Sequence, residues 1–143
     1  MMPIRILLVE DNPGDIELTV EAFKEGKITN EIEIVNDGQA AMDCLRNTGE
    51  YVQSKRPDII LLDLNLPKKD GRQVLQEIKN DPHLKRIPVV ILTTSAGQED
   101  ILKAYDNHAN CYIRKPVDLN NFMEVIRKIE SFWLTIVKLP SVP

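Results

Sequence analysis

The chain has 143 residues, of which 43% are hydrophobic and 28% are charged, and its formal net charge is −4. This composition is typical of one globular domain, and the mild acidity gives no support for nucleic-acid binding. The longest apolar runs are too short to span a membrane, and the N-terminal sequence lacks a signal-peptide pattern. We therefore expect a cytoplasmic protein with neither a membrane nor a nucleic acid as its partner.

Five segments have the pattern of β-strands. Residues 4–9, 59–62 and 89–92 are continuous apolar runs rich in β-branched residues, which suit strands buried on both faces of a parallel sheet. Two weaker segments have mixed or alternating polarity, at 31–34 and 110–114. These two segments suit the edges of the sheet.

Helical patterns separate the predicted strands. The first follows Asn12-Pro13, where Asn can cap a helix and Pro fits its first turn, and it ends at Gly26. The last begins at about Asp118. The residues at helical spacing are, for the five helices in turn, Ile16, Thr19, Val20 and Phe23; Ala41, Cys44, Leu45 and Thr48; Val74, Leu75 and Ile78; Ile101, Leu102 and Tyr105; and Leu119, Phe122, Ile126, Ile129, Trp133 and Ile136.

The regular alternation of strand and helix predicts a doubly wound α/β fold, in which a five-stranded parallel sheet carries helices on both faces. Because the first, third and fourth strands are the apolar ones, we expect the flavodoxin-like strand order 2-1-3-4-5. Cys44 and Cys111 lack the spacing of a metal or redox motif and are predicted to be core residues. His83 and His108 are predicted to lie on the surface.

Polar residues follow four of the predicted strands. Glu10 and Asp11 follow the first strand, Asp63 the third, Thr93 the fourth and Lys115 the fifth. In an open parallel sheet, ligands bind beyond the carboxyl ends of the strands, where the strand order reverses. The predicted fold therefore gathers these residues on one rim, although they are far apart in the sequence.

This combination of residue types favours phosphoryl chemistry. Three neighbouring carboxylates repel one another unless a cation lies among them, and Mg²⁺ prefers such oxygen ligands. A carboxylate can attack phosphorus, while Lys115 would neutralise charge and the Thr93 hydroxyl would donate a hydrogen bond. Each motif alone has an ordinary explanation as a solvated turn, a helix cap or a surface loop. Their placement at four strand ends favours the functional interpretation.

At these residues the chain resembles the receiver domains of two-component response regulators, from about Ile4 to about Ile129. The matching motifs are Leu-Leu-Val-Glu10-Asp11-Asn, Leu-Leu-Asp63-Leu-Asn-Leu-Pro67-Lys-Lys-Asp-Gly71, Val-Val-Ile-Leu-Thr93-Thr94 and Arg-Lys115-Pro116. The resemblance implies that Asp63 accepts a phosphoryl group from a sensor histidine kinase in a Mg²⁺-dependent reaction. It also implies that the protein catalyses only its own phosphorylation and slow dephosphorylation.

The resemblance also assigns a metal site. Asp11, Asp63 and the backbone carbonyl of Asn65 would bind Mg²⁺ directly, and Glu10 would bind it through water. Many relatives have Asp at the position of Glu10, where Glu is a common alternative.

The remaining assignments concern the phosphoryl group and the response to it. Thr93 and Lys115 would contact the phosphoryl group. Tyr112 matches the aromatic residue that rotates inward in the active state, so Thr93 and Tyr112 form the expected switch. The peptide bond between Lys115 and Pro116 is expected to be cis.

A closer resemblance, to small single-domain regulators associated with phytochrome kinases, rests on Gly49-Glu50-Tyr51, on Arg56-Pro57 and on the tail from Ile129 to Leu134. We therefore expect one receiver domain over residues 1–143, with a C-terminal helix extension or tail over about 130–143 and no effector domain. Its output would be protein contact, phosphate relay or a phosphate sink. The apolar last helix and tail predict a homodimer, with the alternative that the tail folds back onto its own subunit. The kinase partner is expected to be of the phytochrome type.

Two other functions compete with this interpretation. A haloacid-dehalogenase-like phosphatase also uses a strand-end Asp, but it needs a second Asp two residues later, where this chain has Asn65. A pseudo-receiver that never takes phosphate usually lacks one of the acidic residues, the acceptor Asp or the Lys, and all are present here.

Overall fold

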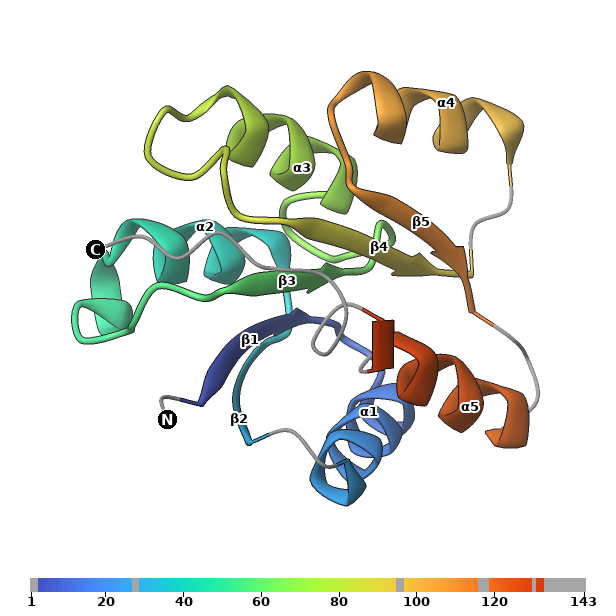
Figure 1. The fold of residues 1–143 in the computed structure, drawn as a ribbon. Coiled ribbons are helices and arrows are strands. Elements are labelled where there is room, and N and C mark those ends of the chain that lie inside the picture. The colour runs from blue at the N-terminus through green and yellow to red at the C-terminus, as the bar shows by residue number, and fades with distance from the viewer. Residues whose placement is uncertain (1–2, 27–28, 95–96, 116–118, 130, 133–143) are drawn as a thin grey trace.

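The computed structural model describes residues 3–26, 29–94, 97–115, 119–129 and 131–132 (Figure 1). The strands and helices alternate along the chain, with one short 3₁₀ helix, η1, after the second α-helix. In order they are β1 (Ile4–Val9), α1 (Pro13–Glu25), β2 (Asn30–Val35), α2 (Gly38–Arg46), η1 (Gly49–Tyr51), β3 (Ile59–Leu62), α3 (Gly71–Asn80), β4 (Val89–Thr93), α4 (Gln98–Asp106), β5 (Cys111–Arg114) and α5 (Leu119–Ile129).

The five strands form one parallel sheet in the order β2-β1-β3-β4-β5, which confirms the predicted topology. Every residue of β3 and β4 is buried, whereas β2 and β5 are partly exposed at the two edges. The register pairs Val9 with Leu62 and Leu62 with Ile91. This register brings the carboxyl ends of the central strands level with one another.

Two helical layers enclose the sheet (Figure 1). Helices α1 and α5 cover one face, where Phe23 and Ile126 pack with Ile6 and Leu8 of β1. Helices α2, α3 and α4 cover the opposite face, where alternate residues of the same strands meet the helical side chains. The central strands are apolar on both faces because a hydrophobic core lies on each side of the sheet.

Capping residues in the sequence fix where the first helix begins and ends. The Asn12 side chain caps α1 by accepting a hydrogen bond from the Asp15 N–H at 3.0 Å, and Pro13 occupies the first helical position. Gly26 ends the helix, as predicted.

His83 and His108 are exposed, which confirms their predicted surface positions.

Three apolar predictions were wrong in detail. The exposed fractions of Leu102 and Tyr105 are 56% and 49%, so the predicted stripe of α4 does not face the core, and Ala104 is its buried residue. Helix α4 lies beside the edge strand β5, which offers it little surface to cover. For the same reason Cys111, on β5, is only partly buried, whereas Cys44 is buried. Thr48 is exposed because α2 ends at Arg46.

A fork of hydrogen bonds attaches α4 to α3. The Arg72 guanidinium donates to both carboxylate oxygens of Asp100 at 2.7 Å, to Asp70 at 3.0 Å and to the Leu64 carbonyl oxygen at 3.4 Å. The hydrogen bond to Asp100 is the main cause that raises the pKa of Arg72 above its ordinary value. A bidentate contact of this kind fixes geometry as well as charge.

The C-terminal prediction is only partly covered by the described residues. Ile126 and Ile129 of α5 are buried, whereas Trp133, Ile136 and the tail after residue 132 lie outside the described part, as does the Lys115–Pro116 peptide bond. None of the helices in the described ranges is long and apolar enough to cross a membrane.

Gly71, the first residue of α3, lies against the loop that follows β3. Its N–H donates to the Leu64 carbonyl oxygen at 2.9 Å. A Cβ atom at this position would lie 2.2 Å from the Asp63 carbonyl oxygen and 2.6 Å from the Leu64 Cα. The obstacle is backbone, so a side chain here would displace the segment that carries Asp63.

We therefore expect Gly71→Ala to lower the free energy of unfolding by about 1–3 kcal/mol, since overpacking against backbone forces a shift. Urea denaturation measures the change. Gly97→Ala is the matched control, because a Cβ there meets nothing within 4 Å among the described atoms. In the control, the lower entropy of the unfolded chain offsets the weaker cap, and we expect a change below about 0.5 kcal/mol. Equal effects of the two substitutions would contradict the packing argument.

Candidate functional site

The predicted rim exists at the carboxyl edge of the sheet. Backbone hydrogen bonds continue the sheet just beyond its strands: the Asp63 N–H donates to the Val9 carbonyl oxygen at 3.1 Å, and the Lys115 N–H to the Thr93 carbonyl oxygen at 2.7 Å. The side chains of Glu10, Asp63, Thr93 and Lys115 are all buried. The sheet thus brings together four polar residues whose burial requires compensation.

Lys115 supplies that compensation. Its ammonium contacts Asp63 at 3.0 Å, Asp15 at 2.9 Å and, most closely, a carboxylate oxygen of Glu10. Burial alone would lower the pKa of Lys115, but its hydrogen bonds and the carboxylate charges, those of Glu10 foremost, raise that pKa above its ordinary value. The ammonium is therefore charged at neutral pH.

Asp63 accepts hydrogen bonds on both carboxylate oxygens. The Thr93 hydroxyl donates to Oδ1 at 2.7 Å, the Asn65 N–H donates to the same oxygen at 3.2 Å, and Lys115 binds Oδ2. Burial by itself would raise the pKa of Asp63, but the hydrogen bond from Thr93 and the charge of Lys115 lower it below its ordinary value. Asp63 is therefore an ionised carboxylate at neutral pH, which a nucleophile must be.

Glu10 has a different electrostatic environment. Burial raises its pKa to about 7, although Lys115 and the Asn12 N–H lower it in part. The N–H groups of Asp11 and Asn12 donate to one Glu10 oxygen at 3.1 and 3.2 Å. A divalent cation bound at this rim would add to Lys115 in favouring the ionised form of Glu10.

The rim fits a divalent metal ion. Glu10, Asp11 and Asp63 each offer a carboxylate oxygen, and these oxygens lie within 4.8 Å of one another. Asp11 is exposed, so this side of the cluster is open to solvent. Carboxylate oxygens are hard ligands of the kind that Mg²⁺ and Mn²⁺ prefer, and an open side leaves room for water ligands.

Asp15 is the site residue that the sequence interpretation missed. The only local signal was its position in the first turn of α1, where an acidic residue has an ordinary explanation in the helix dipole. Its contact with Lys115 joins residues 100 positions apart. Only the packing of α1 beside the end of β5 reveals that contact.

The structure describes the surroundings of the predicted switch residue Tyr112 and of the loop residue Asn65. Tyr112 is half-buried, and its N–H donates to the Tyr105 hydroxyl at 3.2 Å. Asn65 is exposed beside Asp63 and has no carboxyl group, so it cannot act as the general acid of a phosphatase.

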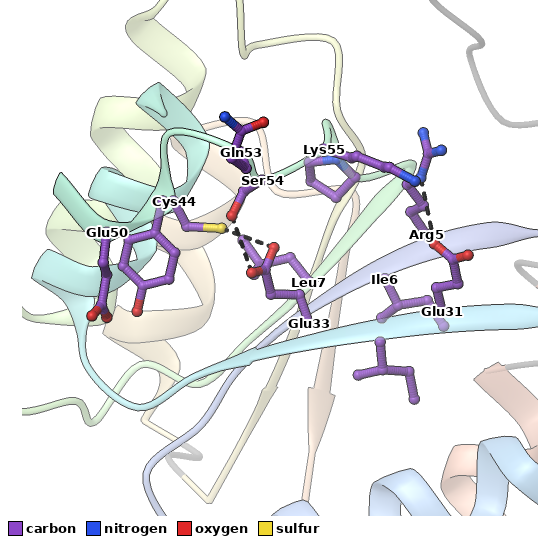
Figure 2. Close-up of a pocket in the computed structure, with 13 residues that line it drawn as sticks. Arg5, Ile6, Leu7, Glu31, Glu33, Cys44, Glu50, Gln53, Ser54 and Lys55 are labelled. Carbon is purple, nitrogen blue, oxygen red and sulfur yellow. Dashed lines mark hydrogen bonds and ion pairs between the residues drawn. The ribbon is translucent and has the colours of Figure 1, made fainter. Parts of the chain in front are cut away.

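A separate cleft of about 520 Å³ lies between η1 and the edge strand β2 (Figure 2). On its floor, the carboxylate of Glu33 accepts hydrogen bonds from the Cys44 thiol at 3.3 Å and from the Ser54 hydroxyl at 3.1 Å. Burial raises the pKa of Cys44 to about 11, so the thiol is not a nucleophile at neutral pH. The hydrogen bonds from Cys44 and Ser54 to Glu33 give these polar side chains a structural role in the cleft.

Comparison with known proteins agrees with the geometry of the rim. The sequence profile of the response regulator receiver domain matches residues 6–127. Response regulator Rcp1 from Synechocystis sp. is 52% identical over 139 residues, which cover 97% of this chain and 95% of Rcp1.

Solved structures extend the similarity to the backbone. The crystal structure of the Mn²⁺-bound form of Rcp1 matches with a TM-score of 0.95 at 52% identity, covering 97% of this chain and all of that one. The phosphorylated cyanobacterial phytochrome response regulator RcpA matches with the same TM-score at 53% identity, covering 98% of this chain and all of that one. The bacteriophytochrome response regulator AtBRR is 41% identical, with a TM-score of 0.74 and coverage of 96% and 100%.

Proposed function

The chain belongs to the family of response regulator receiver domains, and we propose that Asp63 is the residue that accepts the phosphoryl group. Receiver domains of this family are the signalling partners of histidine kinases in two-component phosphorelays. The observation that carries the assignment is the environment of Asp63: a buried, ionised carboxylate between the Thr93 hydroxyl at 2.7 Å and the Lys115 ammonium at 3.0 Å.

The proposed reaction is a direct transfer. An oxygen of Asp63 attacks the phosphorus of a phosphohistidine on the kinase, an O–P bond forms, and the N–P bond breaks with its electron pair remaining on the imidazole nitrogen. Lys115 and the Thr93 hydroxyl contact oxygens of the transferred group. When bound by Asp11, Asp63 and the Asn65 carbonyl, with Glu10 acting through water, Mg²⁺ supplies the positive charge that offsets repulsion between carboxylate and phosphoryl oxygens. Slow hydrolysis of the acyl phosphate resets the protein.

The proposed partner is a sensor histidine kinase of the phytochrome type. Support comes from the similar structures RcpA and AtBRR, which are a phytochrome and a bacteriophytochrome response regulator. We further propose that the chain is a single receiver domain over residues 1–143 with a C-terminal extension, in which Thr93 and Tyr112 respond to phosphorylation and protein contacts carry the output.

Incubation with acetyl phosphate and Mg²⁺ tests the acceptor. Intact-mass spectrometry should show the addition of one phosphoryl group to the wild-type protein and none to Asp63→Asn, because the amide is not a nucleophile. Asp106→Asn, which changes an exposed Asp at the end of α4, is the matched control and should retain the full yield. An undiminished yield in Asp63→Asn would refute the assignment.

Asp11→Ala tests the metal site. We expect a weakening of Mg²⁺ binding by at least about tenfold, because even outer-shell partners of metal ligands contribute that much. Isothermal titration calorimetry measures the binding, and the phosphorylation rate at fixed Mg²⁺ should fall with it. Glu17→Gln, an exposed substitution on α1, removes the same charge away from the rim and should leave both quantities unchanged. Wild-type Mg²⁺ affinity in Asp11→Ala would rule out its role as a ligand.

We also propose a homodimer formed through the last helix and the tail. Phe132 follows α5 along the chain, and 51% of its surface is exposed. Exposed apolar surface marks an interface when it forms part of a larger patch. The apolar residues further along the tail, at 133, 136 and 139, would extend the same surface. Two-fold symmetry is the commonest arrangement for such a contact.

Sedimentation equilibrium tests the dimer at tens of micromolar protein, with and without phosphorylation. The full chain should sediment as a dimer, and a version that ends at Glu130 should sediment as a monomer, because it lacks the apolar tail. Trp133→Ala should weaken the dimer, whereas Lys138→Ala, in the same tail, should not. A monomeric full chain under both conditions would exclude the dimer.

A further inference from the structure

Asp15 completes the coordination of the Lys115 ammonium. A lysine ammonium carries three N–H donors and no acceptor. In this structure three carboxylates contact it, those of Glu10, Asp15 and Asp63. The side chain of Lys115 is almost fully buried, with 3% of its surface exposed, so water has little access to the donors. Removal of any one carboxylate would leave a buried donor without its partner.

The start of α1 fixes the position of Asp15. The Asn12 side chain accepts from the Asp15 N–H at 3.0 Å, and the Thr19 hydroxyl donates to the Asp15 carbonyl oxygen at 2.7 Å. Thr19 is itself buried. Asp15 therefore approaches Lys115 from a helix whose first turn is tied down, whereas Glu10 and Asp63 approach it from the ends of strands.

Asp15 also differs from the other two carboxylates in its relation to the metal. The cluster of carboxylate oxygens within 4.8 Å of one another comprises Glu10, Asp11 and Asp63, and in the described ranges Asp15 is not a member. Metal binding would engage Glu10 and Asp63, and phosphorylation would convert Asp63 to an acyl phosphate. Asp15 is the partner of Lys115 that neither event removes.

We propose that Asp15 is a positioning residue that holds the Lys115 ammonium beside Asp63, so that the ammonium is in place when the phosphoryl group arrives. This inference rests on the proposed function of Asp63. Lysine has a flexible four-carbon side chain, and an anchored ammonium avoids an ordering cost during the reaction. Asp15 touches neither the phosphoryl group nor the metal, and its effect is exerted through Lys115.

The first test is the rate of phosphorylation by saturating acetyl phosphate and Mg²⁺. Asp15→Asn should lower that rate by about three- to tenfold, because a poorly positioned ammonium stabilises the transition state less well. Asp15→Glu keeps the charge and should recover part of the loss. Glu17→Gln, which removes a charge from an exposed position on the same helix, is the control and should retain the wild-type rate. A wild-type or higher rate in Asp15→Asn overturns the proposal.

A double-mutant cycle separates positioning from a general electrostatic effect. If Asp15 acts through Lys115, then Asp15→Asn should change the rate by less than about 1.5-fold in a Lys115→Ala background. If Asp15→Asn changes the rate in the Lys115→Ala background by the same factor as in the wild-type background, the proposal is overturned. That result would mean that Asp15 acts directly on the metal or on the phosphoryl donor.

A second readout needs neither metal nor phosphate. In ¹⁵N-labelled protein, the ammonium protons of Lys115 should exchange slowly enough with water to be observed, because three carboxylates hold them in a buried site. Asp15→Asn should speed the exchange until the signal broadens, while circular dichroism confirms the fold. An unchanged Lys115 signal overturns the proposal. Failure of wild-type protein to accept phosphate would instead refute the function of Asp63, and the exchange measurement would still decide the role of Asp15.

Discussion

Four carboxylates meet at the carboxyl edge of the sheet, and their mutual repulsion is the constraint around which this end of the molecule is organised. The ammonium of Lys115 contacts three of them, Glu10, Asp15 and Asp63, and its own burial is tolerable only because they surround it. The hydrogen bonds from Thr93 and Lys115 keep Asp63 ionised despite its burial. Burial raises the pKa of Glu10 to about 7, although Lys115 lowers it in part. The same balance of charges prepares the rim for a cation and for a phosphoryl group.

The sheet converts this balance into a rigid geometry. Asp63 and Thr93 lie at the ends of β3 and β4, the two strands that are buried along their whole length. Tight packing on both faces leaves these strands few alternative positions. Lys115 follows the edge strand β5 and Asp15 lies in α1, and polar contacts join the two. The site thus combines the proposed nucleophile on a buried strand end with an ammonium that polar contacts hold beside it.

Much of this arrangement could be predicted from residue patterns. The β-branched runs at 4–9, 59–62 and 89–92 distinguish central from edge strands and thereby select the strand order, which in turn brings Asp63 and Lys115 to one rim. The errors at Leu102 and Cys111 share a physical cause. Burial beside an edge strand depends on how much surface that strand offers, which spacing alone does not reveal for Leu102 or Cys111. The role of Asp15 depends on the packing of α1 against the end of β5, a tertiary contact with no local signature.

The attachment of α4 has a consequence for the local stability of the molecule. Its side chains Leu102 and Tyr105 are 56% and 49% exposed, and the ionic fork from Arg72 to Asp100 ties its first turn to α3. Ionic contacts with partial solvent exposure weaken as mobile ions accumulate, whereas an apolar core does not weaken in this way. The contact that attaches α4 to α3 therefore depends on ionic strength more than the packing of the sheet does. Because Arg72 also donates to the carbonyl oxygen of Leu64, next to Asp63, the same side chain links α4 to the loop that follows β3.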